Sequence, residues 1–252
     1  MDDANTEILF GIHPLYEALR ANRRNIYEVY LAQDKTSARI SALAAEAQSR
    51  GIPILNLKTS RLEALVKSGA HQGIAAKVSS YPLEPFIDIW QSTAGRKGKP
   101  FWLLLDNILD PQNLGAILRT ALCVGVDAVV IPKDRSASPT PAVSKASAGA
   151  LEHIRLTRVT NLVRTLRQLK ENGMWIIGLD KKANQSVYTA DLTGSIGLLL
   201  GGEQKGLRPL VKKHSDFLVS IPQLGPLDSL NASVAGAVVM YEVLRQRRTA
   251  NS

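Results

Sequence analysis

The sequence predicts an α/β protein with a small N-terminal α/β domain and a larger domain that contains a parallel sheet. Short apolar runs alternate with helical patterns along the chain, as in folds where helices separate the strands. In the second part these runs are apolar throughout, which is typical of parallel strands covered on both faces. Pro82, Pro85 and the basic run at 95–100 interrupt the pattern and predict a linker over residues 80–100. We therefore expect domains over residues 1–79 and 101–252.

In the N-terminal part, Pro14 stands at the favoured first position of a helix. A second helix is expected over residues 37–50, and Gly51 is its C-terminal stop. The tetrad Ser60-Arg61-Leu62-Glu63 matches a capping box, in which the serine opens a third helix. Strands are expected at residues 26–31, 53–57 and 74–78.

In the second part, the apolar runs and the helical patterns continue to alternate. Thr160 is the expected cap of one helix, and Gly173 ends it. Cys123 stands among apolar residues of another helix and is expected to be buried. Strands are expected at residues 101–106, 128–131, 175–179, 196–200 and 217–221. Helices are expected at residues 84–93, 113–124, 141–150, 161–172 and 231–247, with a helical turn at 211–214.

Composition limits the class of protein. Hydrophobic residues make up 45% of the 252 residues, which is enough for a packed core. The net charge of +9 favours a polyanionic partner, although aromatic residues are only 5% and indicate no base-stacking platform. One cysteine excludes an internal disulfide, and no apolar run is long enough for a membrane span. The polar, acidic start lacks the pattern of a signal peptide, so we expect a cytoplasmic protein.

Several familiar site motifs are missing. No G-x-G-x-x-G follows a strand, which disfavours a standard dinucleotide site. Residues 201–206 have glycines at Walker-like spacing, but Leu207-Arg208 stands where such a loop needs Lys followed by Ser or Thr. The four histidines are scattered without Cys/His ligand spacing, so we expect no metal site.

Three loops join an apolar run to a helix and are rich in Gly, Pro, Asn or Ser. They are residues 110–121 (DPQNLGAILRTA), 198–207 (LLLGGEQKGL) and 221–235 (IPQLGPLDSLNASVA). Open α/β sheets bind ligands at such strand ends. In this order, the three loops resemble the three motifs of the SpoU (TrmH-type) RNA 2′-O-ribose methyltransferases. Residues 10–14 (FGIHP) and 70–74 (AHQGI) resemble that family's N-terminal RNA-binding domain.

The resemblance implies both a fold and a reaction. The fold would be a SPOUT-type catalytic domain with a deep trefoil knot, preceded by an L30e-like RNA-binding domain. The reaction would move a methyl group from S-adenosylmethionine to a ribose 2′-hydroxyl, in a homodimer and without a metal ion. The resemblance places the cofactor pocket at Gly201, Ile221 and Leu230. It assigns the catalytic site to Arg119, Asn113, Glu203, Ser229 and Asn231.

Among members of this family, the chain most resembles the guanosine-2′-O-methyltransferases of large-subunit (23S) ribosomal RNA. Other substrates stay open: an adenosine of ribosomal RNA, as in the thiostrepton-resistance type, or a transfer RNA. A different class, a non-catalytic RNA-binding factor of ribosome assembly, also stays open.

Some residue roles also stay open. Asn113 and Asn231 fit helix N-caps as well as ligand contacts, and Glu203 fits a brace that accepts backbone N–H bonds. Because a guanidinium is almost always protonated, Arg119 suits a phosphate clamp better than a base.

Overall fold

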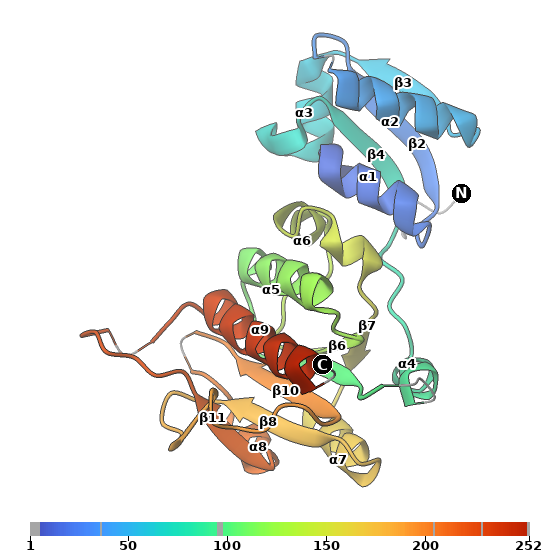
Figure 1. Cartoon of the computed structure of the whole chain (residues 1–252). Helices are drawn as coiled ribbons and strands as arrows, with labels where there is room; N and C mark the ends of the chain where they lie inside the picture. The colour runs from blue at the N-terminus through green and yellow to red at the C-terminus, as the bar shows by residue number, and fades with distance from the viewer. Residues whose placement is uncertain (1–5, 36, 95–97, 204, 228, 251–252) are drawn as a thin grey trace. The chain divides into compact units, whose positions relative to one another are not determined.

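The chain forms two compact units, each with its own sheet (Figure 1). The computed structural model describes residues 6–35, 37–94, 98–203, 205–227 and 229–250. The first unit comprises residues 1–82 together with 138–153, and the second comprises 83–137 and 154–252. The predicted class is confirmed: an N-terminal α/β domain accompanies a domain built on a parallel sheet.

The first unit contains a four-stranded sheet in the order β1-β4-β2-β3. β4 pairs antiparallel with both β1 and β2, while β2 and β3 are parallel. The strand β1 was not expected from the sequence. The elements of residues 6–79 are β1 (Thr6–Phe10), α1 (Ile12–Ala21), β2 (Ile26–Ala32), α2 (Ala38–Ser49), β3 (Ile54–Leu57), α3 (Thr59–Val66), a 3₁₀ turn (Gly69–His71) and β4 (Ile74–Ser79).

Helices cover both faces of this sheet. Successive residues of a strand point to opposite faces, so neighbouring strand residues pack against different helices. Val29 and Ala76 belong to a buried cluster with α1 and α2. Their chain neighbours Tyr30 and Ala75 pack with Leu62 of α3 on the other face. Figure 1 shows α1 and α2 in front of the sheet and α3 at its far side.

Residues 138–153 lie between two strands of the second unit in sequence but belong to the first unit. They form α6 (Pro141–Ala146) and a 3₁₀ turn (Ala150–His153), so the helix expected over 141–150 is shorter than predicted. Arg24 Nε lies 2.8 Å from the carboxylate of Glu152, and both side chains are buried. Burial raises the pKa of Glu152, against the attraction of Arg24 and a hydrogen bond donated by Ser144.

The second unit contains a seven-stranded sheet in the order β7-β6-β5-β10-β8-β11-β9, in which every pair is parallel. β10 lies between β5 and β8, two strands that precede it in the chain; the trefoil knot itself stays a prediction. The elements are α4 (Phe86–Ala94), β5 (Phe101–Asp106), α5 (Pro111–Val124), β6 (Ala128–Pro132), β7 (Leu156–Val159), α7 (Leu162–Glu171), β8 (Trp175–Leu179), β9 (Gln185–Ser186), β10 (Ile196–Gly201), α8 (Pro209–Lys213), β11 (Phe217–Ser220) and α9 (Ala232–Ala250).

Helices also cover both faces of the second sheet. α4, α7 and α8 share a buried cluster with Trp102 and Leu104 of β5. α5 and α9 pack together on the opposite face. A Cβ atom at Gly236 of α9 would lie 2.7 Å from Leu200 of β10, so this glycine lets the helix approach the sheet closely. The helix expected at 84–93 within the linker is confirmed as α4, and its Ile89 is fully buried.

Several local predictions were wrong. Ser60 lies inside α3, whose N-cap is Lys58 and which has no side-chain cap bond. Asn161, not Thr160, caps α7 by accepting a hydrogen bond from Arg164 N. Cys123 is exposed, because the buried stripe of α5 follows residues three or four apart and ends at Ala121 and Val124. Within the described residues, no helix has the length and apolar character that crossing a membrane requires.

We predict that Glu152→Ala destabilises the protein by about 3 kcal/mol, because it removes one partner of a buried charge pair. Glu46→Ala is the matched control: it breaks a half-exposed pair with Arg50 and should cost at most about 1 kcal/mol. Scanning calorimetry of the full chain measures both. Equal losses of stability in the two variants would contradict a stabilising role for the buried pair of Arg24 with Glu152.

Candidate functional site

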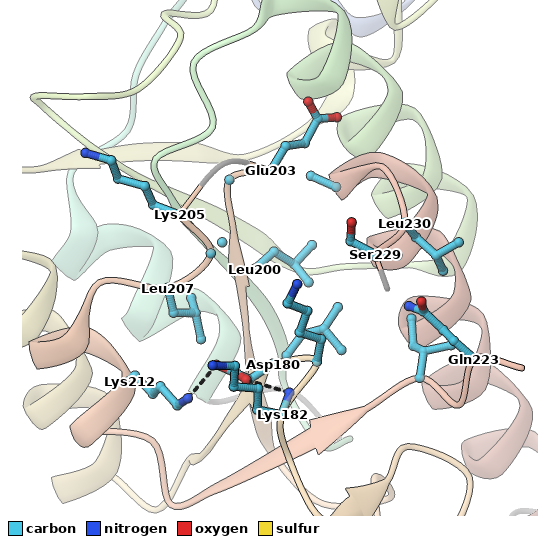
Figure 2. Close-up of a pocket in the computed structure, with 18 of the residues that line it drawn as sticks. Asp180, Lys182, Leu200, Glu203, Lys205, Leu207, Lys212, Gln223, Ser229 and Leu230 are labelled. Carbon is cyan, nitrogen blue, oxygen red and sulfur yellow. Dashed lines mark hydrogen bonds and ion pairs between the residues drawn. The ribbon is translucent and has the colours of Figure 1, made fainter. Parts of the chain in front are cut away.

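A cavity of about 540 Å³ opens at the carboxyl ends of β8, β10 and β11 (Figure 2). This is the edge at which open parallel sheets bind ligands. Its walls combine aliphatic side chains with charged ones from the loops. The lining residues are Leu179, Asp180, Lys181, Lys182, Leu200, Gly201, Gly202, Glu203, Lys205, Gly206, Leu207, Pro209, Lys212, Ile221, Gln223, Ser229, Leu230, Ala232 and Ala235.

The loop after β10 turns back tightly on itself. Gly206 N donates to Gly202 O at 2.8 Å, and the two residues form an isolated bridge. A Cβ atom at Gly201 would lie 2.2 Å from the carbonyl carbon of Gly206 and 2.4 Å from Leu207 N. Only glycine therefore fits at 201 with the loop in this position.

Glu203, in this loop, joins the three sequence motifs. Asn113 Nδ2 of α5 donates to Glu203 Oε1 at 3.1 Å, and Asn231 Nδ2 donates to the same oxygen. Asn231 Nδ2 also lies 2.9 Å from Asn113 Oδ1. The two asparagines and one carboxylate thus connect the loop to the first turns of α5 and α9. The predicted brace is confirmed, but its donors are side-chain amides rather than backbone N–H groups.

The two asparagines differ in their capping role. Asn231 Oδ1 accepts hydrogen bonds from Ser233 N at 2.9 Å and from Val234 N at 3.3 Å, so Asn231 caps α9 while its amide nitrogen reaches Glu203. Asn113 is not a cap, since Asp110 caps α5 by accepting from Gln112 N. The cap expected at Asn231 is therefore confirmed, and the cap expected at Asn113 is wrong. Contact of either asparagine with a ligand stays a prediction.

Asp106 anchors the far end of the same loop and was missed by sequence reasoning. It ends β5, is fully buried, and accepts from Arg208 N at 2.9 Å and from Arg208 Nε at 2.7 Å. A carboxylate at the end of an apolar strand was the available signal. The pair fixes the segment after Leu207 against β5.

A second charged group, after β8, was also missed. Asp180 forms an ion pair of 2.6 Å with Lys212 of α8 and accepts from Lys182 N at 2.8 Å (Figure 2). Burial alone would raise the pKa of Asp180, but the hydrogen bonds from Lys212 and Lys182 outweigh burial and lower it. With Lys205 on the opposite wall, the cavity presents several cations together with two carboxylates.

The structure gathers most of the predicted site residues. All three expected cofactor residues line the cavity: Gly201, Ile221 and Leu230. Glu203 and Ser229 line it too, while Asn113 and Asn231 stand behind Glu203. Arg119 is separate: it is exposed on α5, does not line the cavity, and has no hydrogen bond or ion pair with another described residue.

Among the described residues, no group of three or more His, Cys, Asp or Glu side chains is arranged to hold a metal ion.

The second unit has a charged cavity at the strand ends of a parallel α/β domain, which is typical of ligand-binding α/β proteins. Comparison with known proteins identifies the family within this class. Residues 100–241 match the model of the SpoU rRNA methylase family, and residues 8–84 match that of the RNA 2′-O ribose methyltransferase substrate-binding domain. The chain belongs to the SpoU rRNA methylase family.

Relatives with curated names match nearly the whole chain. The 23S rRNA (guanosine-2′-O-)-methyltransferase RlmB of Pseudomonas putida is 38% identical over 242 residues, which covers 96% of this chain and 97% of the relative. RlmB of Shewanella oneidensis is 40% identical over 243 residues and covers 96% and 98%.

A solved structure agrees with the fold. The SpoU methyltransferase AviRb from Streptomyces viridochromogenes, in complex with AdoMet, has a TM-score of 0.81 at 22% identity and covers 98% of this chain and 92% of its own. At this identity the likeness supports the fold alone.

Proposed function

We propose that this protein transfers the methyl group of S-adenosylmethionine to the ribose 2′-hydroxyl of a guanosine in 23S ribosomal RNA. The observation that carries the proposal is the match of about 40% identity, over both domains, to relatives named for this reaction. The net charge of +9 suits an RNA substrate. With this substrate, we propose that the protein acts in the cytoplasm.

The cavity fits this cofactor. Its volume of about 540 Å³ lies within the usual range for small-molecule sites. Ile221 and Leu230 supply aliphatic walls for the adenine ring, and the loop at Gly201 supplies closely approaching backbone. The carboxylate of Glu203 is a favourable neighbour for a positively charged sulfonium. When bound, the cofactor supplies a methyl group that is already activated for transfer.

The protein's task is then to position the hydroxyl and to stabilise the charge that develops on it. Glu203, held by Asn113 and Asn231, fixes the loop at the cavity mouth. Ser229 presents its hydroxyl at the same mouth. Lys182 and Lys205 offer cations for a phosphate next to the target ribose. Arg119, with five fixed donors, suits the same phosphate and the developing alkoxide.

A homodimer would bring further groups to this site. Arg119 does not line the cavity, and the faces beside it expose large apolar side chains. Leu122 of α5 and Val234 and Tyr241 of α9 are exposed on helices that share one face of the sheet. Leu224 and Leu227, in the loop before α9, are also exposed. A second copy covering these faces is the arrangement we propose.

The proposed reaction is tested directly with the purified protein. Unmodified 23S rRNA transcript and bulk transfer RNA are each incubated with S-adenosylmethionine labelled in the methyl group. Label should enter the ribosomal RNA and not the transfer RNA. Label in the transfer RNA alone would contradict the proposed substrate, and label in neither would favour a non-catalytic assembly factor.

Gly201→Ala should weaken S-adenosylmethionine binding at least about tenfold, a loss of ~1.4 kcal/mol. The added methyl collides with the backbone of Gly206 and Leu207 and displaces the loop. Gly225→Ala is the matched control, since its Cβ would have no neighbour within 4 Å. Titration calorimetry, with circular dichroism as the folding check, compares the two. Unchanged affinity in a folded Gly201→Ala protein would remove this loop from the cofactor site.

Arg119→Ala should lower single-turnover methyl transfer by at least about 100-fold, the scale seen when one preorganised electrostatic group is lost. Cofactor affinity should stay the same, because Arg119 does not line the cavity. Arg164→Ala removes an exposed arginine from α7, on the opposite face of the sheet, and should transfer at the normal rate. Near-normal transfer by Arg119→Ala would exclude it from catalysis.

Light scattering should find a dimer at micromolar concentration. Tyr241→Glu, which places a charge on the exposed face of α9, should shift the protein towards monomer. Tyr188→Glu alters an equally exposed tyrosine in the loop after β9 and should leave the dimer intact. A monomeric wild-type protein, or equal effects of both substitutions, would contradict the proposed interface.

A further inference from the structure

The first unit holds a second cavity, of about 680 Å³, between α1 and α2. Both helices lie on the same face of the four-stranded sheet (Figure 1). Leu19 and Leu43 form its apolar floor and belong to the buried cluster beneath the helices. Its size is that of a site for a small molecule or a nucleotide. Nothing in the proposed chemistry uses this cavity, which lies wholly within residues 12–46.

An aromatic ring and a cation stand together at its rim. The side chain of Tyr16 is 45% exposed although the cavity floor is apolar. The guanidinium carbon of Arg20, one helical turn further along α1, lies 5.4 Å from the centre of the Tyr16 ring. A phenol ring and a guanidinium plane are the two surfaces on which unpaired bases stack in RNA-binding proteins.

The charges of the cavity favour an anion as the occupant. Its two carboxylates already have partners: Glu46 accepts two hydrogen bonds from Arg50, and Glu17 Oε2 lies 2.7 Å from His153 Nε2. Arg39, at the start of α2, is exposed and has no hydrogen bond or ion pair with another described residue. Its guanidinium is therefore available for a phosphate.

We infer that this cavity binds one unpaired nucleotide of the RNA substrate, with the base stacked on Tyr16 and a neighbouring phosphate on Arg39. An unpaired nucleotide is required, because bases in a duplex do not expose their faces. The inference rests on the proposed RNA substrate and deepens it, since it names the place where the first unit reads the RNA. Tyr16 would then supply a stacking surface in a chain whose aromatic content is only 5%.

Tyr16→Ala and Arg39→Ala test the inference in the full-length protein, with matched controls. Tyr27→Ala removes a tyrosine of similar exposure, 43%, from β2 outside the cavity. Arg61→Ala removes an exposed arginine from α3, on the other face of the sheet. Filter binding to a 23S rRNA transcript measures affinity without requiring catalysis. Single-turnover methylation over a range of RNA concentrations separates half-saturation from the maximal rate.

Tyr16→Ala should raise the RNA dissociation constant and the half-saturating RNA concentration about tenfold, the scale of losing one base stack. The maximal rate and the S-adenosylmethionine affinity should not change, because the cavity that binds the cofactor lies in the other unit. Tyr16→Phe keeps the ring and should bind RNA normally. Arg39→Ala should reduce the salt dependence of binding by about one phosphate contact. Tyr27→Ala and Arg61→Ala should stay within twofold of wild type.

Equal binding by Tyr16→Ala and Tyr27→Ala would overturn the inference, whether or not the protein methylates RNA. A wild-type protein that binds the transcript but transfers no methyl group would instead overturn the proposed function, and the Tyr16 comparison would still decide this site. If Tyr16→Ala does not fold, Arg39→Glu replaces it and should weaken binding more than Arg61→Glu does.

Discussion

The site depends on the hydrogen bonds that the carboxylate of Glu203 accepts. This carboxylate accepts hydrogen bonds from the side-chain amides of Asn113 and Asn231, which are 118 residues apart. Asn113 lies in the first turn of α5 and Asn231 caps α9, and these helices pack on the same face of the sheet. Three loops that are distant in sequence are thereby fixed at one sheet edge. The loop that carries Glu203 is held at its base by Gly201, where only glycine fits, and at its end by the buried pair of Asp106 with Arg208. The cavity walls follow from these constraints.

Much of this arrangement was predictable, because it depends on local chemistry. Apolar runs predicted the buried parallel strands, and the loops at their ends predicted where a ligand would bind. The choice of Gly201, Glu203 and Ser229 came from the resemblance of these loops to the SpoU motifs. Asp180 and Asp106 were missed because their roles depend on partners that the fold supplies: Lys212 and Arg208 are distant in sequence. A carboxylate after a strand marks a candidate residue but does not indicate which distant residue pairs with it.

Prediction of secondary structure from the sequence failed where pairing with distant segments determines the structure. β1 is a short segment that becomes a strand by pairing with the distant strand β4, in which Phe10 is the partner of Ala75. β7 is the edge strand of its sheet and, within the described residues, pairs with β6. Ser60 has the residue pattern of a cap, but α3 begins one residue earlier. Residues 138–153 belong to the first unit through contacts such as Arg24 with Glu152 and Lys145 with Gln72, which no local pattern reveals.

We propose that the sheet edge organised by Glu203 transfers a methyl group to the 2′-oxygen of a guanosine in 23S rRNA. Nuclease digestion and mass spectrometry of 23S rRNA, from cells with and without the gene, identify the methylated nucleoside directly. One 2′-O-methylguanosine should disappear without the gene and return when the wild-type gene is restored. Unchanged 2′-O-methylguanosine, or the loss of a methyladenosine instead, would contradict it.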